Sequence, residues 1–94
     1  MRSFAERKVS GGKLVCIEIE YDSSIRSVKI TGDFFLHPEE SLQKIEKSLI
    51  GLGADADRKE IVGRIAQIVA EENAELIGIT PEAIAETILK AVKR

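Results

Sequence analysis

The pattern of apolar and polar positions divides the chain into a strand-rich first third and a helical remainder. From Val15 to Tyr21, apolar side chains alternate with polar ones, which is the two-residue period of a strand with one buried face. The same alternation resumes at Ile25 and places Val28 and Ile30 inward. Short polar side chains at residues 22–24 predict the turn between these two strands.

A weaker pattern precedes these two strands. The sequence "SGG" (Ser10–Gly12) is typical of a turn. Residues 3–9 then form a first strand, which gives a three-stranded antiparallel meander. A two-stranded sheet is the alternative, because the alternation over residues 3–9 is incomplete.

The rest of the chain carries apolar residues at three- and four-residue spacing, which is typical of helices with one buried face. Three such helices are predicted. Strands followed by helices indicate an α+β fold in which the helices pack on one face of a small sheet. At 94 residues, we expect one domain spanning 1–94. The predicted buried stripes are Leu42, Ile45, Leu49 and Ile50 in the first helix, Ile61, Val62, Ile65, Ile68 and Val69 in the second, and Ile84, Ile88, Leu89 and Val92 in the third.

Capping signals predict where these helices begin and end. Pro38 is expected at the first position of the first helix, and Gly51 follows its last turn as a left-handed cap. Asp57 and Glu60 have the spacing of a capping box, and Thr80–Pro81 is a typical start for the third helix. The basic residues expected near the negative end of the third helix dipole are Lys90, Lys93 and Arg94.

Composition narrows the class of protein. The 14 basic and 16 acidic residues are nearly balanced, whereas nucleic-acid binding needs a basic excess. One cysteine and one histidine are too few for a zinc or iron–sulfur site within the chain, so we expect no metal site. The sequence has neither a membrane-length apolar stretch nor a signal-peptide core. We therefore expect a cytoplasmic protein that binds neither nucleic acid nor membranes.

Most clusters of chemically active residues have a simpler structural explanation. Glu71, Glu72 and Glu75 fit a solvated helix end better than a cation site. Cys16 lies within a strand, without a basic neighbour in sequence that would lower its pKa. The segment "SGGK" (Ser10–Lys13) lacks the spacing of a phosphate-binding loop and precedes a strand rather than a helix. We therefore expect no catalytic residue and no bound cofactor in this chain.

The segment "GDFF" (Gly32–Phe35) is different, because it gathers two aromatic rings, a carboxylate and a glycine. If the strand alternation continues, Gly32 and Phe34 face the core while Asp33 and Phe35 face outward. An exposed ring is unfavourable unless a partner covers it, and glycine permits a bend or a close backbone approach. Gly32, Asp33, Phe35 and the nearby His37 are therefore the candidate partner interface. The alternatives are a structural role for GDFF and, for His37, either helix entry or acid–base chemistry.

Residues 8–52 combine several features in a fixed order. A glycine-led strand and a turn come first, then a strand ending in GDFF, then P-E-E and a helix; the stretch reads "KVSGGKLVCIEIEYDSSIRSVKITGDFFLHPEESLQKIEKSLIGL". This stretch resembles the C-terminal accessory domain of lipoate–protein ligases. The segment "IGITPEAIAETILKAV" is similar to the closing helix of that domain. In that family, a larger catalytic domain binds lipoate and ATP, forms lipoyl-adenylate and passes the lipoyl group to a lysine of an acceptor domain.

Most members of that family carry both parts in one chain. Here nothing resembles the catalytic domain's arginine–glycine-rich or nucleotide-contacting lysine motifs. The resemblance therefore implies the non-catalytic subunit of a heterodimeric, ATP-dependent lipoate–protein ligase, inactive alone and needed for lipoate activation. It places ATP, lipoate and Mg on the catalytic subunit and implies only indirect contact with a lipoyl-acceptor domain. The alternatives are a small adaptor for an unrelated enzyme and an iron–sulfur scaffold-like protein, which would need more cysteines.

Overall fold

Two small antiparallel sheets and three helices make up the described part of the chain, residues 1–9, 11 and 13–92 of the computed structural model. This arrangement confirms the predicted α+β class. Ser10 and Gly12 of the expected turn, and Lys93 and Arg94 of the expected last helical turn, lie outside the described residues. The elements are β1 (Arg2–Lys8), β2 (Leu14–Tyr21), β3 (Ile25–Gly32), β4 (Phe35–His37), α1 (Glu40–Leu49), α2 (Arg58–Glu71), β5 (Glu75–Ile77) and α3 (Pro81–Ala91).

Strands β1, β2 and β3 form one antiparallel sheet in that order. The three-stranded meander is therefore confirmed, and the incompletely patterned segment 3–9 corresponds to β1. Alternate side chains of a strand point to opposite faces, so one face of the sheet is apolar and the other carries charged side chains. The predicted inward positions that are buried are Val15, Ile17, Ile19, Tyr21, Val28 and Ile30.

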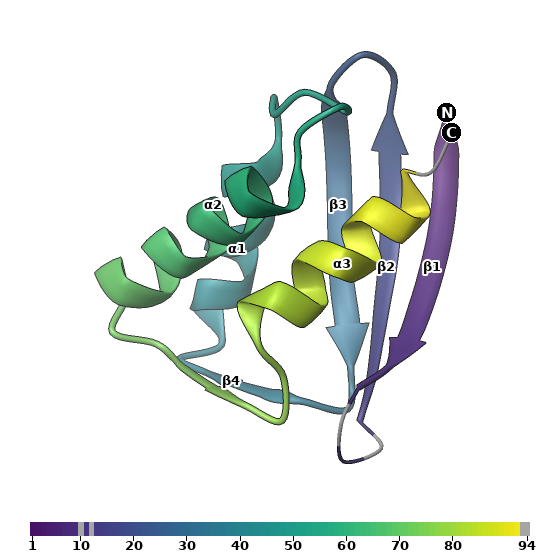
Figure 1. Cartoon of the computed structure of the whole chain (residues 1–94). Coiled ribbons are helices and arrows are strands. Elements are labelled where there is room, and N and C mark those ends of the chain that lie inside the picture. The colour runs from purple at the N-terminus through teal and green to yellow at the C-terminus, as the bar shows by residue number, and fades with distance from the viewer. Residues whose placement is uncertain (10, 12, 93–94) are drawn as a thin grey trace.

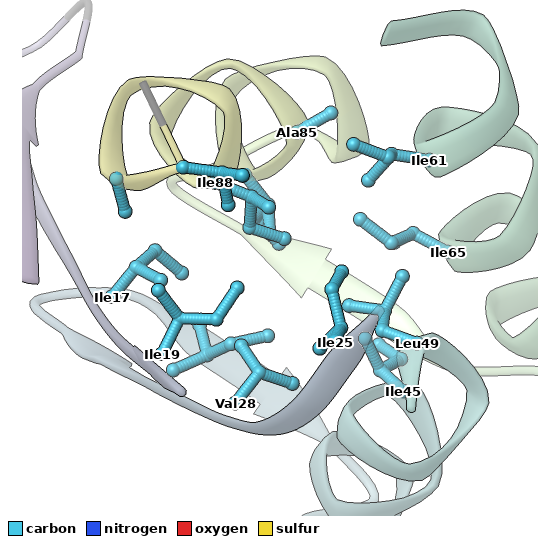
Figure 2. Close-up of a cluster of buried hydrophobic side chains, with 14 of the residues drawn as sticks. Ile17, Ile19, Ile25, Val28, Ile45, Leu49, Ile61, Ile65, Ala85 and Ile88 are labelled. Carbon is cyan, nitrogen blue, oxygen red and sulfur yellow. The ribbon is translucent and has the colours of Figure 1, made fainter. Parts of the chain in front are cut away.

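The three helices lie on the apolar face of this sheet (Figure 1). Helix α1 packs on β3, α3 packs on β1 and β2, and α2 packs chiefly against the other two helices. Figure 2 shows side chains from the sheet and from all three helices pointing toward one another, among them Ile19, Leu49, Ile65 and Ile88. The single core thus lies between the sheet and the helices, as the apolar stripes predict.

Two of the three predicted helix starts are correct. The Asp57 carboxylate accepts a hydrogen bond from the Glu60 backbone N–H at 2.9 Å, and the Thr80 hydroxyl oxygen accepts one from Ala83 at 3.1 Å. Pro81 is the first residue of α3. These side chains satisfy backbone donors that have no partner within the helix, which explains why α2 and α3 begin where they do.

The predicted position of Pro38 is wrong. Helix α1 begins at Glu40, and Glu39 occupies the N-cap position without a capping hydrogen bond from its side chain. The backbone N–H of Ser41 donates to the carbonyl of Pro38, so Pro38 belongs to a turn between β4 and the helix. The peptide bond between His37 and Pro38 is cis.

The prediction that Ile50 is buried is also wrong. Its side chain is 48% exposed, because α1 ends at Leu49 and Ile50 has an extended backbone to which the helical period no longer applies. Leu52 is buried in the core instead. Gly51 has the predicted positive φ, +91°, but its N–H donates to the carbonyl of Ile25 rather than to the last turn of α1, so it does not form the predicted helix cap. The stripe residues that are half-buried rather than buried are Leu42, Val62, Ile68, Val69 and Leu89.

Candidate functional site

Gly32 marks the point where the chain leaves the main sheet. Its φ is +156°, and a Cβ atom there would collide with the backbone carbonyl oxygen of Leu14 in β2. The next residue, Asp33, donates its backbone N–H to that same carbonyl at 2.9 Å. Figure 1 shows β4 diverging from β3 after this point and running past the ends of the helices. The close approach predicted for Gly32 is therefore made by β2 of the same chain, and Gly32 is exposed rather than core-facing.

The chain beyond Gly32 forms a two-stranded ribbon that the sequence pattern did not reveal. Strands β4 and β5 are antiparallel, with Phe35 opposite Ile77, Leu36 opposite Leu76 and His37 opposite Glu75. Leu36 is buried and Leu76 is half-buried against the core. Because side chains alternate along each strand, the other two pairs share the outer face. We call the side chains of Phe35, His37, Glu75 and Ile77 the ribbon's outer face.

The two apolar side chains of the outer face form an exposed pair. Phe35 is 69% exposed and Ile77 is 50% exposed. The expectation that Phe35 points outward is therefore confirmed. The expectation that Phe34 is a core residue is only partly correct, because its ring is half-buried at the edge of the core. The alternation of β3 survives the bend, since Leu36 is buried while Phe35 and His37 are exposed.

Acidic residues flank β4 in the chain, and Glu39 and Glu40 line a hollow beside His37. Asp33, Glu39 and Glu40 are exposed, and we call these three residues the acidic rim. Within the described part of the chain, neither they nor Glu75 form an ion pair. The side chain of Lys13 lies beside Gly78, just after β5, and is a cation close to the ribbon. The region therefore carries an excess of negative charge.

An apolar hollow adjoins Phe35. It has a volume of about 400 Å³ and lies between the end of β3, strand β4 and the first turns of α1. Phe34, Phe35, Leu36 and Leu42 supply its apolar lining, and Glu39 and Gln43 also line it. A second open hollow continues past His37 and Pro38 and shares Glu39 and Gln43 with the first. An apolar side chain of another protein fits such a surface better than a charged ligand does.

Two other residues considered for chemical activity, Cys16 and Glu72, bond to side chains of this chain. Burial, and then the negative charge of Glu6, raise the pKa of the Cys16 thiol, which donates a weak hydrogen bond to the Glu6 carboxylate at 3.7 Å. A raised pKa disfavours the reactive thiolate. Glu72 pairs with Lys44 at 2.9 Å. The described residues contain no cluster of three or more His, Cys, Asp or Glu side chains placed to hold a metal ion.

The fold and the surface together define the class: a small α+β domain whose most distinctive surface is an exposed apolar ribbon with an acidic rim. Among the helices described, none is both long and apolar enough to cross a membrane. Geometry places the four sequence candidates at one end of the molecule. Asp33, Phe35 and His37 are exposed there, and Gly32 forms the bend behind them. Their contact with a partner stays a prediction.

Comparison with known proteins identifies a similar fold. No protein-family model matches the chain, and no curated protein matches it. A solved structure has a chain that superposes with a TM-score of 0.77 and 24% sequence identity, covering 94% of this chain and 94% of that one. That structure is described as an archaeal lipoylation system, a bi-partite lipoate protein ligase and its E2 lipoyl domain from Thermoplasma acidophilum. At this level of identity, the likeness establishes the fold.

The structure predicts different roles for the two adjacent phenylalanines. Phe35→Ala should change the free energy of unfolding by less than about 1 kcal/mol, because it removes one exposed cross-strand pair. Phe34→Ala should cost about 1.5 to 2.5 kcal/mol, half the cost of removing a fully buried ring. Urea titration of both variants measures the difference. Equal losses, or a larger loss for Phe35, would contradict the assignment of Phe35 to the outer face.

Proposed function

We propose that this chain is the cytoplasmic, non-catalytic subunit of a two-protein lipoate–protein ligase, required for the ATP-dependent activation of lipoate. The observation that carries the proposal is the fold, which covers 94% of both chains in the match to the archaeal lipoylation system. The resemblance of residues 8–52 to the accessory domain of these ligases favours the ligase subunit over the lipoyl domain.

Two observations on the described residues support placing ATP and Mg²⁺ on another polypeptide. Among these residues, no group of three or more His, Cys, Asp or Glu side chains is placed to hold a metal ion. Phosphate binding also favours arginines with free donors. Every described arginine is bonded to an acceptor within the chain. The pairs are Arg2 with Glu20, Arg7 and Arg58 with Glu86, Arg26 with Asp22, and Arg64 with the carbonyl of Ser48. The proposal therefore assigns ATP, Mg²⁺ and lipoate to the catalytic subunit.

The contribution of this chain is then indirect. Forming an adenylate requires a preorganised site from which water is excluded. A small domain docked beside such a site stabilises the closed conformation by binding it more tightly than the open one. This chain supplies a rigid core and an exposed apolar ribbon for that contact. Catalytic groups come from the partner, and the acceptor lysine reaches the site when the docked domain moves.

The test compares three samples: this chain, a ligase polypeptide of the same organism that lacks this domain, and their mixture. Lipoate-dependent release of pyrophosphate from ATP should appear in the mixture and be absent from this chain alone. Full adenylation activity of the catalytic polypeptide alone would refute the proposal, as would pyrophosphate release by this chain alone.

A mass measurement of this chain after the reaction separates two roles. An accessory subunit keeps its mass. A mass increase equal to one lipoyl group on a lysine would identify the chain as the acceptor and refute the subunit assignment. Stimulation of an unrelated enzyme, with no effect on lipoate activation, would favour the adaptor alternative.

A further inference from the structure

The outer face of the ribbon is distinct from the other exposed apolar side chains. The large exposed hydrophobic residues among those described are Met1, Phe4, Phe35, Ile50 and Ile77. Phe35 and Ile77 are the two that stand directly opposite each other across a strand pair. Phe4 lies opposite Glu18 on the charged face of the main sheet. An adjacent apolar pair beside an apolar hollow is typical of the centre of a protein–protein interface.

The ribbon is also held in place before any partner binds. Leu36 and Leu76 attach its inner face to the core, and β4 contacts α1. The bend at Gly32 is fixed by the Leu14 carbonyl, which accepts the backbone N–H of Asp33. A surface that is already ordered loses little conformational entropy on binding. The exposed pair is therefore positioned for a rigid contact.

Charge indicates what covers this surface. The acidic rim and Glu75 make no ion pair in the part of the chain that the structure describes. Cations lie beside Gly78, at the far end of β5: Lys13 and Lys8, and Arg7, which pairs with Glu86. A second copy of this chain would bring like charges together, which opposes association. A polypeptide that binds ATP and a carboxylic acid concentrates cationic groups around its site. The acidic rim is complementary to the margin of such a site.

We infer that the ribbon's outer face and the acidic rim form the surface that binds the catalytic subunit, which presents an apolar socket bordered by Lys or Arg. This inference rests on the proposed function. Phe35 and Ile77 enter the socket, while Asp33, Glu39 and Glu75 pair with the cations around it. The apolar pair sets the lifetime of the complex, and the carboxylates accelerate association.

The apolar part is tested by titrating the catalytic polypeptide into fluorescently labelled variants of this chain. Phe35→Ala and Ile77→Ala should each weaken binding by roughly tenfold to thirtyfold, as anchoring residues do. Phe4→Ala is the matched control, because Phe4 is 58% exposed but lies on the main sheet. It should bind like the unmodified chain. Thermal melts establish that each variant is folded.

The charged part is tested by its salt dependence. Binding of the unmodified chain should weaken as NaCl rises from about 50 mM to about 500 mM, because salt screens exposed charges. The triple variant Asp33→Asn, Glu39→Gln, Glu75→Gln should associate more slowly at low salt and depend less on salt. Glu18→Gln, Glu20→Gln on the main sheet is the control and should keep the salt dependence of the unmodified chain.

The results distinguish this inference from the proposed function. If the two chains together release pyrophosphate but Phe35→Ala and Ile77→Ala bind normally, the inference fails and the proposed function stands. If the unmodified chain neither binds nor stimulates the catalytic polypeptide, both fail. Sedimentation of this chain alone gives a further outcome: a dimer that Phe35→Ala dissociates would make a second copy the occupant and overturn the inference.

Discussion

Replacing Ile88 by alanine is expected to lower the free energy of unfolding by about 2 to 5 kcal/mol, the range for deleting a large aliphatic side chain from a core. Ile88 lies in α3, where it is fully buried. Its side chain points between the sheet and the other helices (Figure 2). The loss has two parts: the removed methylene and methyl groups no longer gain from burial, and the remaining cavity forfeits contacts that relaxation restores only in part.

Ile65→Ala in α2 should cost a similar amount, because Ile65 is also fully buried. Ile50→Ala is the matched control. Ile50 has the helical spacing of the stripe predicted for the first helix. Because its side chain is 48% exposed, its replacement should cost less than about 1 kcal/mol. Denaturant titration of the three variants gives the comparison. Losses below about 0.5 kcal/mol for both Ile65 and Ile88 would refute the helix faces assigned here.

The contrast between Ile88 and Ile50 shows how far periodicity predicts the fold. Within a regular element, the spacing of apolar residues determines which side chains face the core, so the buried faces of β2 and β3, and Ile84 and Ile88 of α3, could be predicted. Ile50 has the correct spacing, but the helix ends one residue earlier. The end of a helix depends on backbone contacts with distant segments. The N–H of Gly51 donates to the carbonyl of Ile25, a bond that no local pattern reveals.

The two-stranded ribbon shows a second limit of prediction from the sequence. Strands β4 and β5 have three residues each, which is too short for an alternating pattern to be distinguished from chance. Asn73, with a φ of +51°, and Gly78, with a φ of +89°, mark turns on either side of β5. These two turn residues are the feature of the sequence that could have indicated β5. Pairing across the 41 residues between them then brings Ile77 opposite Phe35, so half of the exposed apolar pair could not be predicted from the sequence.

The candidate site was easier to locate than to explain. The concentration of unusual residues in GDFF correctly indicated exposed Asp33 and Phe35. The same segment also contains a structural requirement at Gly32, which the sequence left as one of two interpretations. Strand alternation predicts the direction of a side chain, whereas the approach of Leu14 depends on the register between β2 and β3. The structural interpretation is therefore correct for Gly32, whereas the interface interpretation of Asp33 and Phe35 stays a prediction.

Gly32→Ala should accordingly be the most damaging small substitution in GDFF, with an expected loss of about 2 to 6 kcal/mol. A positive φ costs a residue with a side chain about 1 to 3 kcal/mol, and forcing an extra methyl group against packed atoms costs a similar amount. The new Cβ would meet the backbone carbonyl of Leu14, which cannot rotate away as a flexible side chain would. Relief requires β2 and β3 to separate, or β4 to swing out with Phe35.

Gly63→Ala provides the opposite expectation for the same chemical change. Gly63 lies within α2, and a Cβ there has no atom outside the helix within 4 Å. Alanine should stabilise the protein by about 0.5 to 1 kcal/mol, because glycine is the poorer helix former. Thermal melts of both variants, with catalytic-subunit binding per folded molecule, separate the effects. If Gly32→Ala melts like the unmodified chain, the bend does not depend on glycine, and the position of Phe35 must be fixed by the ribbon's inner leucines instead.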